Sequence, residues 1–257
     1  MKFSANLGFL WNDLPIDVAI KNAAEAGFLG VEAHWPYDFD PSSIIAALKE
    51  NNLEFLSLNT KPGDLSAGEF GFAAIAQKKN RAKEHIEEAI SFAHQTGCQM
   101  VHVMSGKAEF STGTFDTFCE NLEHATRLAA EREITILIEP INRKDVPGYF
   151  LSNLDDAVKI CEEIKSPNLK IMFDCYHIEI IHGNLLEQFR QNFHRIGHVQ
   201  FASVPSRNEP QFGKLNYPLI FETLQSYGWT GFLGAEYRPK SDICEGLVWL
   251  KSAISRK

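Results

Sequence analysis

The hydrophobic and polar positions along the chain alternate between two patterns. Short runs of apolar, β-branched and aromatic residues are each followed by a polar turn and a stretch with apolar residues at helical spacing. The runs predict eight strands, at residues 2–9, 29–34, 53–60, 100–106, 134–140, 169–176, 196–202 and 230–237. The helical stretches begin near Ile16, Pro41, Asn80, Phe115, Asn153, Leu185, Tyr217 and Cys244. Strand and helix therefore alternate throughout the chain.

Eight strand and helix units in 257 residues favour a (β/α)8 barrel, the TIM barrel fold, with parallel strands inside and helices outside. The strand candidates are largely apolar, as expected when one face packs on helices and the other on the barrel core. An open doubly wound sheet is the alternative, but the turn after the first strand, SANLGFLWND, contains no GxGxxG motif. No linker or low-complexity tract interrupts the pattern, so we expect residues 1–257 to form a single domain.

Composition and charge narrow the class of partner. A formal net charge of −8 gives no electrostatic footprint for nucleic acid or an anionic membrane, and no apolar run approaches about 18 residues. The five cysteines are scattered without a CxxC pair, which is typical of a reducing cytosol, and the N-terminal run is too short and polar for a signal peptide. We expect a cytoplasmic protein that binds a small molecule and neither nucleic acid nor membrane. The sequence leaves a homo-oligomer open.

Oxygen-bearing side chains end four consecutive strand candidates. Glu139 in LIEP, Asp174 in MFDC, Gln200 in HVQF and Glu236 in GAEY each follow an apolar run. One such carboxylate alone is more often a helix cap or a surface ion-pair partner, but the carboxyl ends of barrel strands meet at one face. Converging carboxylates raise one another's pKa unless a cation neutralises them. Oxygen ligands without thiolate favour Mg²⁺ or Mn²⁺, with Co²⁺ or Zn²⁺ also compatible.

Longer stretches around these residues resemble the hydroxypyruvate isomerase family, within the larger group of xylose-isomerase-like barrels. The similar segments are NTKPGDLSAGEFG, VHVMSG, IEPINRKDVPGYFL, FDCYH, HVQFASVPSRNEPQFGKLNYP and GAEYRP. The resemblance implies a metal-assisted isomerisation of hydroxypyruvate to tartronate semialdehyde, or of a four-carbon acid such as 2-oxo-tetronate. It implies that all four strand-end residues hold the metal and that Glu139 and Glu236 carry the protons. The chain departs from the family pattern in FAAIAQKKNRAKEH, which lacks an LPGR-like turn, and at Ser206, where glycine is usual.

The chemistry implied by this resemblance makes two demands. Moving a carbonyl along a hydroxy acid passes through an enediolate, whose charge a Lewis acid must take up. A base must also lie within hydrogen-bond reach of the carbon-bound proton. Glu139 and Glu236 end the fifth and eighth strand candidates, so we expect them on opposite faces of a bound planar enediolate.

Five further polar residues are candidates for substrate binding: His177, Arg207, His102, Asp145 and Arg143. Arg207 is suited to bidentate binding of a substrate carboxylate, with a surface ion pair to Glu209 as the alternative. His177 is expected either to bond a substrate oxygen or to pack under its loop. His102 alternates with two valines and faces inward, as a ligand or as a core histidine. The charged pair at 143 and 145 contacts the substrate or is simply solvated.

Rival functions use the same type of barrel. A ketose 3-epimerase would share the metal site, but relatives with that activity resemble a Glu, Asp, His, Glu ligand set, whereas Gln200 stands here. A DNA-repair phosphodiesterase resembling endonuclease IV would recruit further histidines, such as His34 and His102, and would need a basic groove, which the charge of −8 disfavours. The segment 61–77 is long for a barrel connection and is expected to be either a lid or an ordered surface loop.

Overall fold

The computed structural model describes residues 1–255. Its strands follow one another in chain order around a closed barrel, so the predicted (β/α)8 fold is confirmed. The strands are β1 (Lys2–Asn6), β2 (Gly30–Ala33), β3 (Glu54–Asn59), β4 (Met100–His102), β5 (Thr135–Ile138), β6 (Leu169–Asp174), β7 (Ile196–Phe201) and β8 (Phe232–Ala235). The helices are α1 (Ile16–Ala26), α2 (Pro41–Asn51), α3 (Lys79–Thr96), α4 (Thr112–Ala130), α5 (Leu154–Ile164), α6 (Cys175–Ile181), α7 (Leu185–Asn192), α8 (Tyr217–Ser226), α9 (Ile243–Gly246) and α10 (Val248–Ile254).

Short 3-10 turns complete the secondary structure: η1 (Pro36–Asp38), η2 (Ala76–Lys78), η3 (Phe193–Arg195) and η4 (Pro210–Phe212). Internal contacts divide the chain into two compact units. The first contains Met1–Leu56, Asp174–Phe193 and the chain from His198 onward, and the second contains Ser57–Phe173 and His194–Gly197. None of the helices within residues 1–255 is long and apolar enough to cross a membrane.

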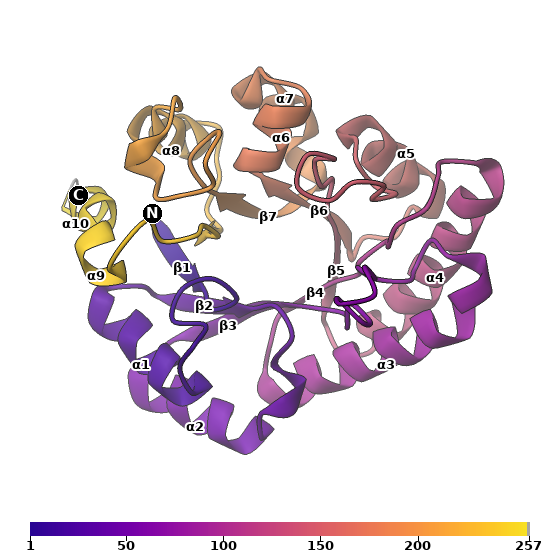
Figure 1. Cartoon of the computed structure of the whole chain (residues 1–257), viewed down its shortest axis with the longest axis horizontal. Coiled ribbons are helices and arrows are strands. Elements are labelled where there is room, and N and C mark those ends of the chain that lie inside the picture. The colour runs from indigo at the N-terminus through magenta and orange to yellow at the C-terminus, as the bar shows by residue number, and fades with distance from the viewer. Residues whose placement is uncertain (256–257) are drawn as a thin grey trace. The chain divides into compact units, whose positions relative to one another are not determined.

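The first unit is built on β7, β8, β1 and β2. Ala5 of β1 lies opposite Val31 of β2 and Ala235 of β8, and Phe201 of β7 pairs with the same Ala235, all in parallel register. Helices α1 and α2 lie side by side in this unit (Figure 1). Aromatic rings fill its interior, with the Phe201 ring 5.1 Å from Trp249 and 4.9 Å from Phe221. This packing holds the carboxyl ends of β7 and β8 in place.

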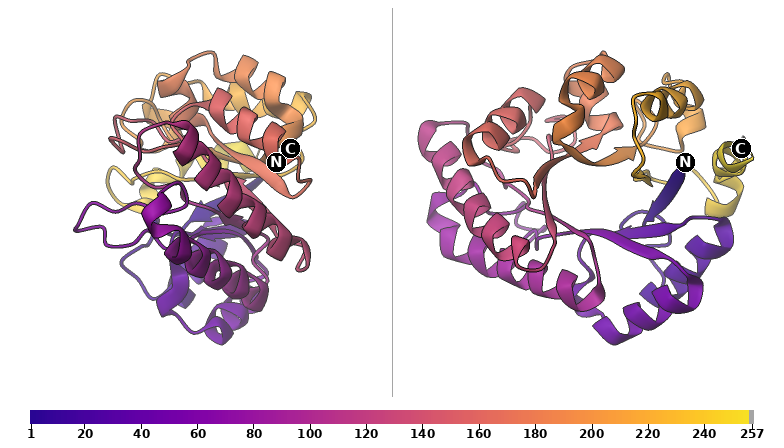
Figure 2. Two further views of the ribbon diagram at one scale, coloured as in Figure 1. Left: turned by 90° about the vertical axis from the view of Figure 1, so that its right-hand side faces the viewer. Right: turned by 180° about the vertical axis from the view of Figure 1, so that it is seen from behind.

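The second unit is built on β3, β4, β5 and β6. Its strands are also parallel, and its two longest helices, α3 and α4, run side by side (Figure 2). The segment 61–77 belongs to this unit and is fixed to the residues that follow β4. Gly71 N–H donates to Pro62 O at 2.7 Å and Ala74 N–H to Ser105 O at 2.7 Å. The segment is thus anchored at its second half, while its exposed tip lies around residues 64–68.

Polar side chains fix several helix starts; at α5, Asn153 accepts the N–H of Asp155 at 2.9 Å. Asp40 caps α2 by accepting the N–H of Ser42 at 3.2 Å. Ser111 and Thr114 form a reciprocal capping box at α4. These contacts satisfy backbone donors that a helix leaves open in its first turn.

Several predicted boundaries differ from the structure; the strand candidates at 2–9 and 100–106, for example, end at Asn6 and His102. The strand candidate at 169–176 ends at Asp174, because this carboxylate accepts the N–H of Tyr176 at 2.9 Å and starts α6, a helix that the sequence pattern did not predict. The helix expected from Cys244 is split into α9 and α10 at Leu247. At Asp174 a hydrogen bond between the side-chain carboxylate and the backbone ends the strand, although apolar residues continue past it.

Candidate active site

Two of the predicted strand-end carboxylates meet on one arginine in the first unit. Asp174 ends β6 and Glu236 follows β8, and their residues are only 1% and 6% exposed. Arg207 Nη2 lies 2.6 Å from Glu236 Oε2 and 3.6 Å from Asp174 Oδ2. Because both carboxylates approach the same nitrogen, they are neighbours. The structure therefore places two buried negative charges around a single guanidinium.

Glu236 is surrounded by hydrogen-bond donors. Asn6 Nδ2 donates to Glu236 Oε1 at 3.1 Å, and His34 Nε2 lies 3.1 Å from the same oxygen. Burial, the largest single effect, raises the pKa of Glu236, but the charges of Arg207, His34 and His177 and the His34 hydrogen bond together lower it to about 2. Glu236 is therefore ionised at neutral pH.

Arg207 is held in place by the loop that follows β7. Its N–H donates to Ser203 O at 2.8 Å, and its carbonyl accepts the N–H of Arg238 at 2.7 Å. Its φ of 54° lies in the left-handed region, a strained conformation that proteins often keep at functional sites. The guanidinium lies 5.1 Å from the ring centre of Phe9 and 5.0 Å from that of Tyr176. The sequence-based alternatives were a substrate carboxylate or Glu209, whereas here the guanidinium faces two carboxylates of its own chain.

Asp174 combines two roles that the sequence treated as alternatives. Its Oδ1 caps α6 through the N–H of Tyr176, while its Oδ2 lies 3.6 Å from His177 Nε2 and 3.6 Å from Arg207. His177 lies in the first turn of α6, is 1% exposed and faces the Asp174 carboxylate.

Gln200 contributes a buried oxygen in β7. Its Nε2 donates to Glu32 Oε2 at 2.7 Å, whereas its Oε1 has no hydrogen-bond partner among residues 1–255. A buried carbonyl without a partner costs about 1–3 kcal/mol, which an oxygen-seeking cation would recover. An amide oxygen and two carboxylates are hard donors, so these residues are compatible with a divalent metal.

The remaining predicted residues lie in the second unit. Glu139 follows β5 with 5% exposure, and its Oε2 is 3.6 Å from Nδ1 of His102, which is 2% exposed in β4. Asn142 Oδ1 accepts the N–H of Asp145 at 3.0 Å and so shapes the loop after Glu139. Arg143 and Asp145 are both exposed on that loop, as expected for solvated charges.

Sequence reasoning missed three polar residues of the first unit, Asn6, His34 and Glu32. Asn6 ends β1 and His34 follows β2, so the comparison of strand ends would have found both if it had included the first two strands. His34 entered only as a ligand for the DNA-repair alternative. Glu32 gave a different signal, a single charge inside the apolar run LGVEAH.

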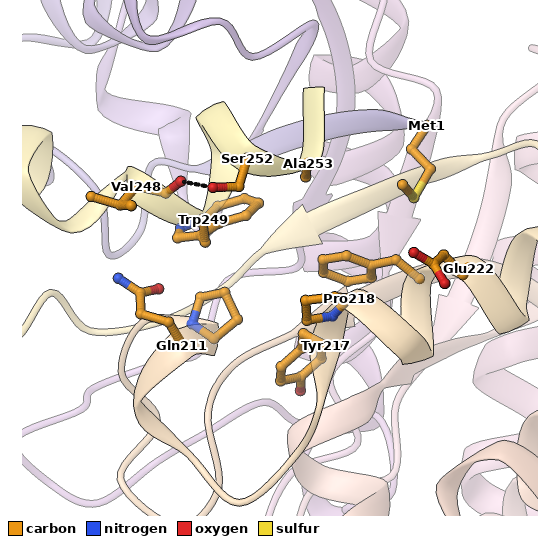
Figure 3. Close-up of a pocket in the computed structure, with 11 residues that line it drawn as sticks. Met1, Gln211, Tyr217, Pro218, Glu222, Val248, Trp249, Ser252 and Ala253 are labelled. Carbon is orange, nitrogen blue, oxygen red and sulfur yellow. Dashed lines mark hydrogen bonds between the residues drawn. The ribbon is translucent and has the colours of Figure 1, made fainter. Parts of the chain in front are cut away.

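A cavity of about 230 Å³ lies elsewhere in the first unit. Its walls come from α8, α10 and Met1, and Figure 3 shows Tyr217 and Pro218 on one side with Trp249 on the other. The lining is mostly apolar, with Glu222 as its charged residue. The lining of this cavity does not include Asp174, Arg207 or Glu236.

Comparison with known proteins agrees with the barrel fold. A family model described as xylose isomerase-like TIM barrel matches residues 20–253. The chain belongs to this family. Among members of this xylose isomerase-like family, the 2-oxo-tetronate isomerase of Cupriavidus necator is 39% identical over 99% of each chain. The hydroxypyruvate isomerase of Escherichia coli is 35% identical over 97% of this chain and 98% of its own length.

A solved structure extends the similarity. The crystal structure titled AP endonuclease, family 2, from Brucella melitensis superimposes with a TM-score of 0.94 at 38% identity, covering 98% of each chain. The family relationship thus spans the whole barrel and not only the strand ends.

Proposed function

We propose that this chain is an isomerase that moves the carbonyl of a short 2-oxo acid between C2 and C3. The substrate pair is hydroxypyruvate and tartronate semialdehyde, or a four-carbon acid such as 2-oxo-tetronate. One observation carries the proposal: the buried carboxylates of Asp174 and Glu236 converge on Arg207, at 3.6 Å and 2.6 Å. Relatives over the full chain bear both isomerase names. All five cysteines are free, in keeping with the expected cytoplasmic location.

The reaction is redox-neutral. The C3–H bond breaks and its electron pair forms an enediolate across C2 and C3. A C2–H bond then forms, the C3 hydroxyl becomes the carbonyl, and its proton passes to the oxygen on C2. The protein must therefore accept one carbon-bound proton, stabilise a dianion and return a proton to the neighbouring carbon.

Four oxygen-bearing residues would hold the divalent metal: Glu139, Asp174, Gln200 and Glu236. Each lies at or near the carboxyl end of its strand, where barrels of this kind build active sites. Mg²⁺ or Mn²⁺ suits these hard donors best. When bound, the ion supplies Lewis acidity toward the two substrate oxygens that bear charge in the enediolate.

Arg207 binds the substrate carboxylate in this proposal. Its two planar N–H donors match a carboxylate, and the Phe9 and Tyr176 rings favour a guanidinium between them. A substrate carboxylate that draws Arg207 away from Glu236 removes the charge that lowers the pKa of Glu236 most. Substrate binding would then make Glu236 a stronger base.

Glu236 and Glu139 are the two proton carriers. Asn6 and His34 both engage Glu236 Oε1, which leaves its second oxygen, now on Arg207, to face the substrate. Glu139 follows β5, and His102 at 3.6 Å from its Oε2 is placed to orient its carboxylate. One glutamate removes the proton and the other returns it.

A substrate comparison tests this function. Metal-loaded wild-type protein is assayed in turn with hydroxypyruvate, 2-oxo-tetronate, free ketoses and abasic DNA. We expect turnover of a short oxo acid, and we expect Glu236→Gln to abolish it while circular dichroism stays unchanged. Turnover of ketoses alone would establish an epimerase, and nicking of abasic DNA would establish the repair function instead.

A further inference from the structure

A further buried carboxylate contacts Gln200, and the proposed chemistry does not use it. Glu32 of β2 is 0% exposed. Its Oε1 accepts the Ser4 hydroxyl at 2.5 Å and lies 2.9 Å from His198 Nε2, while its Oε2 accepts the Gln200 amide at 2.7 Å. Burying a carboxylate costs several kcal/mol unless such partners compensate it. The burial of Glu32 therefore indicates a role other than packing.

The contact with Glu32 fixes which way the Gln200 amide points. A glutamine side chain has donors at one end and an acceptor at the other. Glu32 is held among donors and accepts from Gln200, so a flipped amide would place its oxygen against the Glu32 carboxylate. Gln200 Nε2 therefore faces Glu32 and Oε1 faces away from it. That oxygen is buried and has no hydrogen-bond partner within residues 1–255.

The side chains of Glu32 and Gln200 pack against a glycine of the neighbouring strand. Gly234 of β8 lies opposite Gln200 in the parallel register. A Cβ atom at Gly234 would lie 2.2 Å from Glu32 Oε1 and 3.0 Å from Gln200 Cγ, distances that the packed side chains do not permit. Because glycine has no Cβ atom, the side chains of Glu32 and Gln200 can both pack against the backbone at this position.

We propose that Glu32 is a positioning residue that aims the Gln200 carbonyl oxygen at the divalent cation. This inference rests on the metal site of the proposed function. It adds that the affinity of the site for the metal depends on Glu32, a buried carboxylate that orients the Gln200 amide without touching the metal. Such outer partners typically change metal affinity about 10–100-fold when they are removed.

Direct Mn²⁺ titration of the metal-stripped full-length protein, followed by electron paramagnetic resonance of free Mn²⁺, tests the role without using activity. We expect Glu32→Gln to weaken Mn²⁺ binding about 10–100-fold. Glu209→Gln is the matched control, because Glu209 is also buried in this unit, at 1% exposure, and accepts the Lys240 N–H instead. We expect this control to keep the wild-type affinity within about twofold, since its carboxylate bonds to a different loop.

A double-mutant cycle separates positioning from simple loss of negative charge. If Glu32 acts through Gln200, the double variant Glu32→Gln, Gln200→Ala binds Mn²⁺ as Gln200→Ala alone does. Independent, additive losses would overturn the inference, as would a folded Glu32→Gln protein with wild-type affinity. If Glu32→Gln does not fold, Glu32→Asp keeps the charge but shortens the reach, and wild-type affinity there would also overturn it. Wild-type protein that binds no Mn²⁺, or Asp174→Asn with unchanged affinity, would instead refute the proposed metal site.

Discussion

At the residue scale, the buried carboxylates of the first unit that lie at or beside the candidate site each contact a cationic or hydrogen-bond-donating side chain. Asp174 and Glu236 share Arg207, and Glu32 lies against His198. The sequence showed which strand ends carry oxygen-bearing side chains, because an isolated polar residue after an apolar run can be seen directly in the sequence. It did not show that Arg207 reaches back to them, since the loop after β7 sets that direction through its backbone bonds.

Arg207→Lys tests the carboxylate-binding role. A lysine keeps the charge but cannot make two parallel hydrogen bonds, so we expect KM for the oxo acid to rise about 10–100-fold, equivalent to about 1.4–2.7 kcal/mol. The matched control is Arg190→Lys on α7, an exposed arginine paired with Glu187. Steady-state kinetics that show an unchanged KM for Arg207→Lys would contradict the role.

Gly234→Ala tests whether Glu32 and Gln200 pack closely against the backbone of β8. The added methyl group overlaps both side chains, so we expect a loss of about 1–3 kcal/mol in the free energy of unfolding. Gly113→Ala in α4 is the control, because a Cβ there meets nothing within 4 Å, and we expect a gain of about 0.5–1 kcal/mol. Urea unfolding measures both, and equal stability of the two variants would be inconsistent with the packing described.

At the element scale, short polar contacts decide where helices begin, and they explain the errors of the sequence pattern. The pattern extends a strand through Cys175 and Tyr176 because both are compatible with a buried run. The chain instead turns at Asp174, whose carboxylate caps α6. Periodicity records side-chain burial, whereas a cap depends on one hydrogen bond, so boundaries were predicted less well than the elements themselves.

The capping box at α4 gives a stability prediction. Ser111→Ala removes the acceptor for the Thr114 N–H at 3.2 Å, and we expect a loss of about 1 kcal/mol. Ser111→Asp restores an acceptor at the same position and should recover most of the stability. Thermal and urea unfolding provide the measurement, and equal stability of the alanine and aspartate variants would refute the capping role.

Asp40 gives a pH prediction at the start of α2. Hydrogen bonds from the Ser42 side chain and backbone lower the pKa of Asp40 below its usual value of about 4. A lowered folded-state pKa means that the stabilisation is present above pH about 4 and is lost as the pH falls through the folded value. We expect Asp40→Ala to be less stable than wild type at neutral pH, with the difference shrinking in acid. Urea unfolding across pH would contradict this if the difference stayed constant.

At the scale of the whole molecule, the alternation of strand and helix was enough to predict the barrel. The reason is physical: parallel strands buried on both faces need a covering helix after each strand, and that requirement repeats along the chain. The detailed loops were less predictable. The segment 61–77 is anchored by backbone bonds to residues after β4, and no side-chain pattern encodes such bonds. A single domain and a closing lid stay predictions.

Family membership supports an isomerase function but does not identify the substrate. The relatives named 2-oxo-tetronate isomerase and hydroxypyruvate isomerase are similarly distant, at 39% and 35% identity. Both names describe a reaction that begins with removal of a proton from the carbon next to the carbonyl of a 2-oxo acid. The central claim is therefore the proton transfer itself, and not the length of the acid.

Solvent deuterium exchange measures that claim most directly. Hydroxypyruvate and 2-oxo-tetronate are incubated in D₂O with the Mn²⁺-loaded protein, and the C3 protons are followed by NMR. The account predicts metal-dependent exchange at C3 that falls about 10²–10⁴-fold in Glu236→Gln. Exchange that persists in Glu236→Gln, or exchange that is unaffected by chelating the metal, would contradict it.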